Sequence, residues 1–412
     1  MTESVNTELR IAVIGAGPAG VYSSDIFLRQ LKKLGEELGL GTEARIDLFE
    51  KLPVPFGLVR YGVAPDHPSI KFIASALEKT LDNPNIHLYC DVEFGKDVTL
   101  DDLLARYDAV LFATGAVKDK PLNLPGADLE GVYGAAKFVE WYDGYPTGAR
   151  EWPLTAENVA VIGGGNVAMD VTRSSIRLGA DKVTCVYRRR QADMTALPDE
   201  ITGALAEGAE LMTLAAPVRI EADEDGAAKA LWVQPQIIGE VDKAGRPRPG
   251  KAALEEVRIP ADVIVVAIGQ GVEIQGFDQA GVPIQRGAFV AGLSGQVRDM
   301  DSVFAGGDCV TGPATAIRAI AAGKVAAANI DEHLGFRHEI TVDVEIPSPK
   351  LNNSPPHGRI DTTEREACER KHDFEDIECG LTQEGACAEA GRCLRCDHFG
   401  YGIFRGGRNE KW

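Results

Sequence analysis

Two glycine-rich segments of this chain have a spacing that lets the backbone wrap around a pyrophosphate. Residues 15–20 read GAGPAG and follow the strand-like run 10–14, and residues 163–168 read GGGNVA and follow the apolar run 159–162. Each segment predicts the order strand, glycine turn and helix, in which the helix N-terminus stabilises negative charge. Two such turns, about 150 residues apart, predict that one chain holds two different dinucleotides. Such a pair is typical of electron transfer between a flavin and a nicotinamide.

The residues after the second predicted strand of each unit carry opposite charges. Glu50 follows the strand 46–49, where a carboxylate accepts hydrogen bonds from a ribose diol or is only a surface charge. Three arginines, residues 188–190, follow the strand 183–187. Guanidinium groups suit a 2′-phosphate, which a carboxylate would repel, although a solvated charge run is the alternative. The contrast favours NADP over NAD in the second unit.

The elements around these turns predict an α/β fold. In the first unit we expect helices over about 21–33 and 70–81, and strands over 46–49 and 109–113. The strand 263–267 returns through the second unit. After residue 301 a strand and a helix rich in small residues, ending near 329, return the chain to the first unit. The second unit is therefore predicted to be inserted in the first.

These elements divide the chain into two Rossmann-like dinucleotide-binding domains and a tail. The predicted boundaries are 1–118 and 296–338 for the two parts of the FAD-binding domain, 119–295 for the NADP-binding domain, and 339–412 for a linker and cysteine-rich segment. Asp308 follows the strand near 303–305, where a carboxylate can bond a ribityl hydroxyl. The N-terminus of the next helix can stabilise the charge of a reduced flavin.

Composition narrows the class of protein further. The chain has 412 residues and a net charge of -19, which argues against a nucleic-acid partner. The sequence contains no apolar run long enough for a membrane span, and residues 1–8 lack a signal-peptide core, so a cytoplasmic location is expected.

A longer motif identifies a family resemblance. Residues 53–68 read PVPFGLVRYGVAPDHP. With the two glycine turns, this makes the chain similar, over about residues 9–335, to the adrenodoxin reductase and glutamate synthase small-subunit group of pyridine nucleotide-dependent flavoproteins. The resemblance implies a glutathione-reductase-like arrangement with FAD and NADP(H) as cofactors. Because residues 53–61 contain no cysteine, a thiol relay beside the flavin is not expected.

The motifs and the resemblance together imply which residues form the sites. The FAD contacts implied are Gly15, Gly17, Pro18, Ala19, Glu50, Leu58, Val92, Gly115, Gly307, Asp308, Thr315, Ala316 and Ile317. The NADPH contacts implied are Gly163, Gly165, Asn166, Val167, Arg188, Arg189 and Glu200. Related reductases place a titratable pair near the flavin ring, and His67 and Asp170 match it as candidate catalytic residues. The alternative is that His67 anchors its loop and Asp170 a local network.

One departure from the resemblance indicates the kind of partner. Adrenodoxin-type reductases have a tryptophan before the last helix, whereas this chain reads Gly306-Gly307-Asp308, as the glutamate synthase branch does. This favours an iron-sulfur or flavin subunit of a larger complex as the electron-transfer partner.

The tail contains most of the cysteines. After a proline-rich linker at 343–356, four thiols follow that are enough for one iron-sulfur cluster or a tetrahedral zinc ion: Cys379, Cys387, Cys393 and Cys396. Free thiols are the third possibility, because the spacing matches no standard ligand string. Cys368 can replace any one of the four.

The sequence therefore predicts an FAD-dependent oxidoreductase that takes a hydride from NADPH and passes electrons to an iron-sulfur protein or subunit. Two alternatives stay open, namely a self-contained reductase of a small organic acceptor and a non-catalytic subunit whose tail binds zinc and docks a partner.

Overall fold

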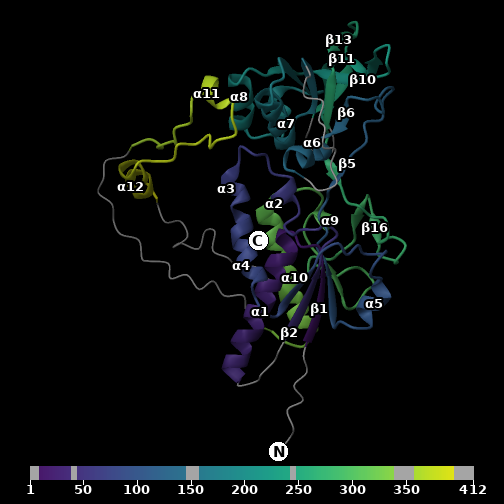
Figure 1. Cartoon of the computed structure of the whole chain (residues 1–412), viewed down its shortest axis with the longest axis vertical. Coiled ribbons are helices and arrows are strands. Elements are labelled where there is room, and N and C mark those ends of the chain that lie inside the picture. The colour runs from purple at the N-terminus through teal and green to yellow at the C-terminus, as the bar shows by residue number, and fades with distance from the viewer. Residues whose placement is uncertain (1–8, 39–43, 145–156, 242–246, 338–356, 394–412) are drawn as a thin grey trace, which may run out of the picture.

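The computed structural model describes residues 9–38, 44–144, 157–241, 247–337 and 357–393 (Figure 1). Two parallel sheets form the centres of two units, and the chain passes from the first unit to the second and back. The predicted linker 343–356 and Cys396 lie outside the described residues. Within the described ranges, every helix is too short or too polar to cross a membrane.

The first unit is built on a parallel sheet in the strand order β18-β4-β1-β2-β3. Its strands are β1 Leu9–Ile14, β2 Ala44–Phe49, β3 Ile86–Tyr89, β4 Ala109–Phe112 and β18 Val303–Ala305. Its helices are α1 Pro18–Leu38, α2 Leu58–Tyr61, α3 Pro68–Lys71, α4 Ile73–Leu81, α5 Leu100–Leu104, α9 Asp308–Thr311 and α10 Ala316–His333. Ile14 lies opposite both Phe49 and Phe112, so the carboxyl ends of three strands meet beside the first glycine turn.

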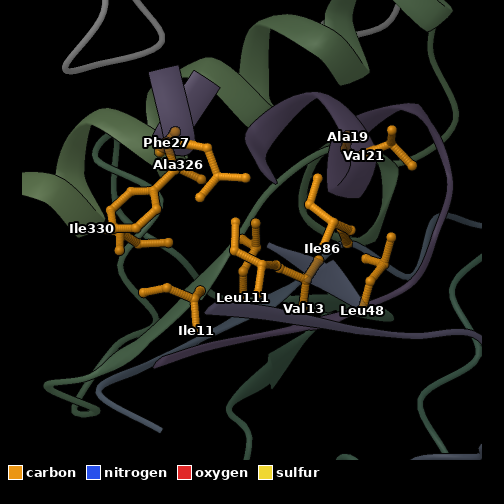
Figure 2. Close-up of a cluster of buried hydrophobic side chains, with 14 of the residues drawn as sticks. Ile11, Val13, Ala19, Val21, Phe27, Leu48, Ile86, Leu111, Ala326 and Ile330 are labelled. Atoms are coloured by element: carbon orange, nitrogen blue, oxygen red, sulfur yellow. The ribbon is translucent and has the colours of Figure 1, made fainter. Parts of the chain in front are cut away.

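Side chains of β1 alternate between two cores. Ile11 and Val13 pack toward α1 and α10, together with Phe27 and Ile330 (Figure 2). A Cβ atom at Gly323 of α10 would lie 2.6 Å from a carbonyl oxygen of α1, so glycine permits the close approach of the two helices. This packing fixes the N-terminus of α1 beside the turn.

The opposite face of the first sheet carries an aromatic core. Phe112 of β4 packs with Phe94, and the ring centroids of Phe94 and Phe277 are 4.4 Å apart. Phe289 belongs to the same cluster, in the small hairpin of β16 Ile284–Gln285 and β17 Ala288–Phe289. Side chains thus pack on the first sheet well before residue 296, where the sequence predicted the return, and we place that return near residue 272.

The second unit has a parallel sheet in the order β6-β14-β7-β8-β9. Its strands are β6 Val132–Gly134, β7 Asn158–Gly163, β8 Lys182–Val186, β9 Glu210–Met212 and β14 Val263–Ala267. The helical elements are α6 Ala135–Tyr142, α7 Asn166–Arg177, η1 Gln191–Asp193 and α8 Pro198–Ala206. An antiparallel sheet is formed by β10 Ala215–Ala222, β11 Ala228–Val241, β12 Pro247–Lys251 and β13 Val257–Pro260. Val159 and Val161 of β7 face the helices, whereas Ala160 and Ile162 face the antiparallel sheet.

Two short antiparallel strands join the units. β5 Lys118–Asp119 carries the chain out and β15 Gln270–Gly271 carries it back. The side chain of Asp119 also accepts a hydrogen bond of 3.0 Å from the backbone of Ala136 at the start of α6. The crossing is thereby tied to a helix of the second unit.

The predicted helix 70–81 is wrong as a single element. The chain forms α3 and α4, with a break at Phe72, whose side chain is 74% exposed. The start of α3 at Pro68 fixes the direction of the loop that precedes it.

The described part of the tail contains α11 Ala367–Arg370, which lies beside α8, and α12 Gln383–Gly391 (Figure 1).

Candidate functional site

A cleft of about 1320 Å³ is lined by residues of both units. Most of the predicted site residues line it, and these are Gly15, Gly17, Pro18, Ala19, Glu50, Leu58, Val92, Gly115, Asp308, Thr315, Ala316, Gly163, Gly165, Asn166, Val167, Arg188 and Arg189. Its lining does not include Gly307, Ile317, Glu200, His67 or Asp170. Ile317 is 77% exposed, and its flavin contact stays a prediction.

The first glycine turn is shaped by close backbone contacts. Gly15 has a φ of +109°, and a Cβ atom there would lie 2.4 Å from the carbonyl oxygen of Ala113. By contrast, a Cβ atom at Gly17 would meet nothing within 4 Å, so this side of the turn is open to the cleft. Gly15 therefore makes the bend and Gly17 leaves room for a ligand.

Glu50 lies buried at the end of β2, against this turn. Its Oε2 accepts a hydrogen bond of 2.9 Å from the backbone of Ala16, and its Oε1 accepts one of 3.0 Å from Leu52. Burial raises the pKa of Glu50. The carboxylate is thus held in place by the turn itself, with lone pairs left to accept from a ligand hydroxyl.

Asp308 faces the same cleft from the end of β18. Its Oδ1 is buried and has no hydrogen-bond partner among the described residues, and burial raises the pKa of Asp308. A buried polar atom without a partner is costly, so this oxygen is suited to a donor supplied by a ligand. Asp308 and Glu50 together fit the hydroxyl groups of a flavin dinucleotide.

The second glycine turn is equally crowded on its inner side. A Cβ atom at Gly164 would lie 2.5 Å from the ring of Tyr187, and one at Gly163 would lie 2.4 Å from the carbonyl oxygen of Ala267. Asn166 opens α7, and its Oδ1 accepts a hydrogen bond of 2.9 Å from Leu197. The turn thus presents the N-terminus of α7 to the cleft.

The three arginines after β8 have different surroundings. Arg190 is paired with Asp193 at 2.8 Å and does not line the cleft. Arg188 is exposed and lines the cleft, as does Arg189, whose Nε donates a hydrogen bond of 3.0 Å to the carbonyl oxygen of Pro247. Two of the three guanidinium groups are therefore available to an anionic ligand, and that of Arg189 is oriented by β12.

The structure brings His67, Asp170 and Glu200 together near the cleft. Nε2 of His67 lies 3.4 Å from Oδ1 of Asp170 and 3.9 Å from Oε1 of Glu200. The hydrogen bond to Asp170 raises the pKa of His67, and burial raises the pKa of Asp170. The two side chains thus share a hydrogen bond that favours the protonated imidazole.

The same three residues could place ligand atoms around a metal ion. The guanidinium group of Arg173, however, already contacts Oε2 of Glu200 at 2.6 Å, and a cation beside it would be repelled. In the described part of the chain, the tail cysteines form no comparable group. Cys379, Cys387 and Cys393 are each exposed and free of disulfides.

Behind this site lies a charged network that was not predicted from the sequence. Arg173 and Arg177 are both buried on α7 and share the carboxylate of Glu207. The available signal was two arginines four residues apart on the core-facing side of a helix. A second missed contact joins the units, since Nζ of Lys71 lies 2.5 Å from Oδ1 of Asp143 on the far side of the junction.

Comparisons with known proteins agree with this geometry. A sequence signature described as pyridine nucleotide-disulphide oxidoreductase matches residues 9–323. The chain is 33% identical over 422 aligned positions to the NADP(+)-dependent formate dehydrogenase subunit beta of Moorella thermoacetica, covering 98% of this chain and 57% of that protein. It is 30% identical over 344 positions to the NADPH glutamate synthase small chain of Halomonas elongata, covering 81% of this chain and 70% of that protein.

A solved structure shows the same fold. Mycobacterium tuberculosis FprA in complex with NADPH matches with a TM-score of 0.69 and 24% identity, covering 80% of this chain and 85% of that one. This likeness confirms the predicted α/β fold with two Rossmann-like units. The chain spans about half the length of several curated relatives that it matches.

Proposed function

Because this chain belongs to the pyridine nucleotide-disulphide oxidoreductase family and is therefore an enzyme of oxidation and reduction, we propose that it transfers a hydride from NADPH to FAD. The electrons then pass to an iron-sulfur protein or subunit, within a larger complex. One observation carries the proposal, namely that a single cleft is lined by both glycine turns. Two nucleotides seated on the turns would share this cleft, which suits direct transfer between them.

The residues of the first unit fit FAD. When bound, FAD accepts a hydride and releases its electrons one at a time. The turn at Gly15 and Gly17 would receive the pyrophosphate at the N-terminus of α1, and Glu50 would accept hydrogen bonds from the ribose. Asp308 would accept from the ribityl chain, and Thr315 at the N-cap of α10 would face the ring system.

The residues of the second unit fit NADPH. Gly165 and Asn166 would hold the pyrophosphate, and the guanidinium groups of Arg188 and Arg189 would hold the 2′-phosphate. His67 would hold a proton near the flavin ring and exchange it with Asp170, because the two side chains are 3.4 Å apart.

We also propose that Cys379, Cys387, Cys393 and Cys396 bind one iron-sulfur cluster that relays electrons to the partner. The three cysteines among them that the structure describes are exposed thiols of one short segment, and the relatives include subunits of larger redox enzymes by name. Because those thiols do not surround one point, binding requires the segment around α12 to rearrange.

Anaerobic absorption spectroscopy tests the hydride transfer. The purified chain should contain a flavin whose absorption is bleached by NADPH, and the electrons should be recovered by an artificial dye. A flavin that stays oxidised in excess NADPH would contradict the proposed function.

Metal analysis tests the cluster separately. Anaerobically prepared protein should contain iron and acid-labile sulfide, which the double variant Cys368→Ser/Cys393→Ser should remove and Cys368→Ser alone should retain. Stoichiometric zinc without iron would support a docking tail instead. Undiminished transfer to the natural acceptor in that double variant would support a self-contained reductase.

A further inference from the structure

The described part of the tail, residues 357–393, is fixed to the second unit by a buried arginine. Arg370 ends α11 and is only 4% exposed. Its Nε lies 3.0 Å from Oε1 of Glu207, the residue that directly follows α8. Its carbonyl oxygen accepts a hydrogen bond of 3.2 Å from Nε of Arg177 on α7. Charged side chains are rarely buried unless they are paired. The burial of Arg370 therefore depends on its contact with Glu207.

Glu207 is shared by three guanidinium groups. Its side chain is 0% exposed, and its oxygens lie 2.7 Å from Arg173, 3.0 Å from Arg177 and 3.0 Å from Arg370. One carboxylate cannot neutralise three buried cations. Each arginine therefore needs a second carboxylate as a partner. The positions of these second carboxylates are in turn fixed by the arginines.

The second carboxylates of Arg173 and Arg177 are those of Glu200 and Asp66, and both act on His67. Nη1 of Arg173 contacts Glu200 at 2.6 Å, and Oε1 of Glu200 lies 3.9 Å from Nε2 of His67. Nη1 of Arg177 lies 3.3 Å from Oδ2 of Asp66, the residue that precedes His67. One chain of charged contacts thus leads from the tail through Arg173 and Glu200 to the imidazole of His67, and a second leads through Arg177 to Asp66, whose charge acts on the same imidazole.

We propose that Arg370 is a positioning residue for the dinucleotide site. By holding Glu207, it fixes Arg173 and Arg177, and these place Glu200 and Asp66 around His67. The tail is then part of the support of the reaction centre as well as a carrier of cysteines. This inference rests on the proposed transfer from NADPH to flavin.

The charged groups around His67 determine how the loss of Arg370 should change the pKa of this imidazole. Asp66 lies in its own loop, Asp170 on α7 and Glu200 on α8, and each raises the pKa of His67. Arg173 and Arg177 stand behind two of these acids and offset them. Removing the cation of Arg370 leaves less positive charge in this region, which favours the imidazolium form of His67.

The test is single-turnover reduction of the flavin by saturating NADPH, measured from pH 5 to 9 in the full-length chain. In Arg370→Gln we expect the rate constant to fall by about 10-fold, because small displacements of reacting groups are costly. The pH profile should also move to higher pH. Arg370→Lys keeps the charge and should restore the wild-type profile with only part of the rate. Arg359→Gln removes an exposed arginine that pairs with Asp361 in the same segment, and it should behave as the wild type.

A lower melting temperature with the wild-type rate and pH profile in Arg370→Gln would overturn the inference, because the role would then be structural only. If Arg370→Gln does not fold, Arg370→Lys decides, since a wild-type rate in that variant would overturn it equally. A wild-type chain whose flavin NADPH does not reduce contradicts the proposed function itself, which separates the two failures.

Discussion

The two dinucleotide-binding units use the same turn but differ at the end of their second strand. Glu50 follows β2, is buried, and is held by two backbone N–H groups of its own unit. Arg188 follows β8 and is exposed, and Arg189 beside it is held by a single carbonyl of β12. We therefore propose that a common glycine turn supplies pyrophosphate binding in both units and that one strand-end position supplies selectivity.

The difference in burial also separates a resident cofactor from an exchanging substrate. A ligand at Glu50 would be enclosed by the turn and by buried carboxylates, whereas one at Arg188 would reach solvent. We therefore expect FAD to copurify with the chain and NADPH to bind and leave in each turnover.

The largest effect is expected from removing the two cationic side chains at the end of β8. Replacing Arg188 and Arg189 together by glutamine should weaken NADPH by about 100-fold, because two charge-assisted contacts to the phosphate are lost. NADH should be affected little, since it lacks the 2′-phosphate. The measurement is kcat/KM for each nucleotide with an artificial dye, and Arg190→Gln is the matched control because Arg190 is committed to Asp193. An equal fall in kcat/KM for NADPH and NADH would contradict the assignment of Arg188 and Arg189 to the 2′-phosphate.

Removing the carboxylate of Glu50 at the end of β2 should have a smaller effect. Glu50→Ala removes the ribose acceptor and leaves the N–H groups of Ala16 and Leu52 without their partner, so FAD affinity should fall by about 10-fold. Glu50→Gln retains the shape and one acceptor and should lose less. Equilibrium dialysis of the deflavinated protein measures both values, and unchanged FAD affinity in Glu50→Ala would show that the carboxylate serves the turn alone.

A third change concerns the contact between Lys71 and Asp143, which joins the two units. Burial raises the pKa of Asp143 to about 6, and Lys71 lowers the cost of its charged form. Above that pH, Lys71→Met leaves a buried carboxylate without its cation, and it should lower the free energy of unfolding by about 2 kcal/mol at pH 8. Near pH 5 Asp143 is largely protonated in the folded state, so the loss should nearly vanish.

Urea unfolding at the two pH values measures this effect. Lys79→Met, at an exposed position of α4, is the control. A loss in Lys71→Met that is equal at pH 5 and pH 8 would contradict the assigned titration of Asp143.

The parts of the site that could be predicted from sequence are those fixed by local chemistry. The turns at Gly15 and Gly163, the strand β14 and the charge reversal between Glu50 and Arg188 each follow from a few neighbouring residues, and the predicted family resemblance is confirmed. The pairing of His67 with Asp170 came only from the resemblance, and the structure places the two side chains in contact.

The remaining features depend on contacts between distant parts of the chain. The three guanidinium groups on Glu207 come from α7 and from the tail, and no local pattern links Arg370 to Arg177. The break at Phe72 directly follows Lys71, which pairs with Asp143 of the second unit, and no local pattern links these two residues. The return of the chain that we place near residue 272 rests on the packing of Phe277 against Phe94, which are far apart in the sequence.

The central claim is that one cleft brings two dinucleotides together for direct hydride transfer. The most direct measurement is a single anaerobic turnover with NADPH carrying deuterium on one or the other face of C4, followed by mass analysis of the NADP+ formed. We expect the flavin to be reduced and the deuterium to be lost completely from one face and retained completely on the other. A flavin that stays oxidised, or label lost equally from both faces, would contradict it.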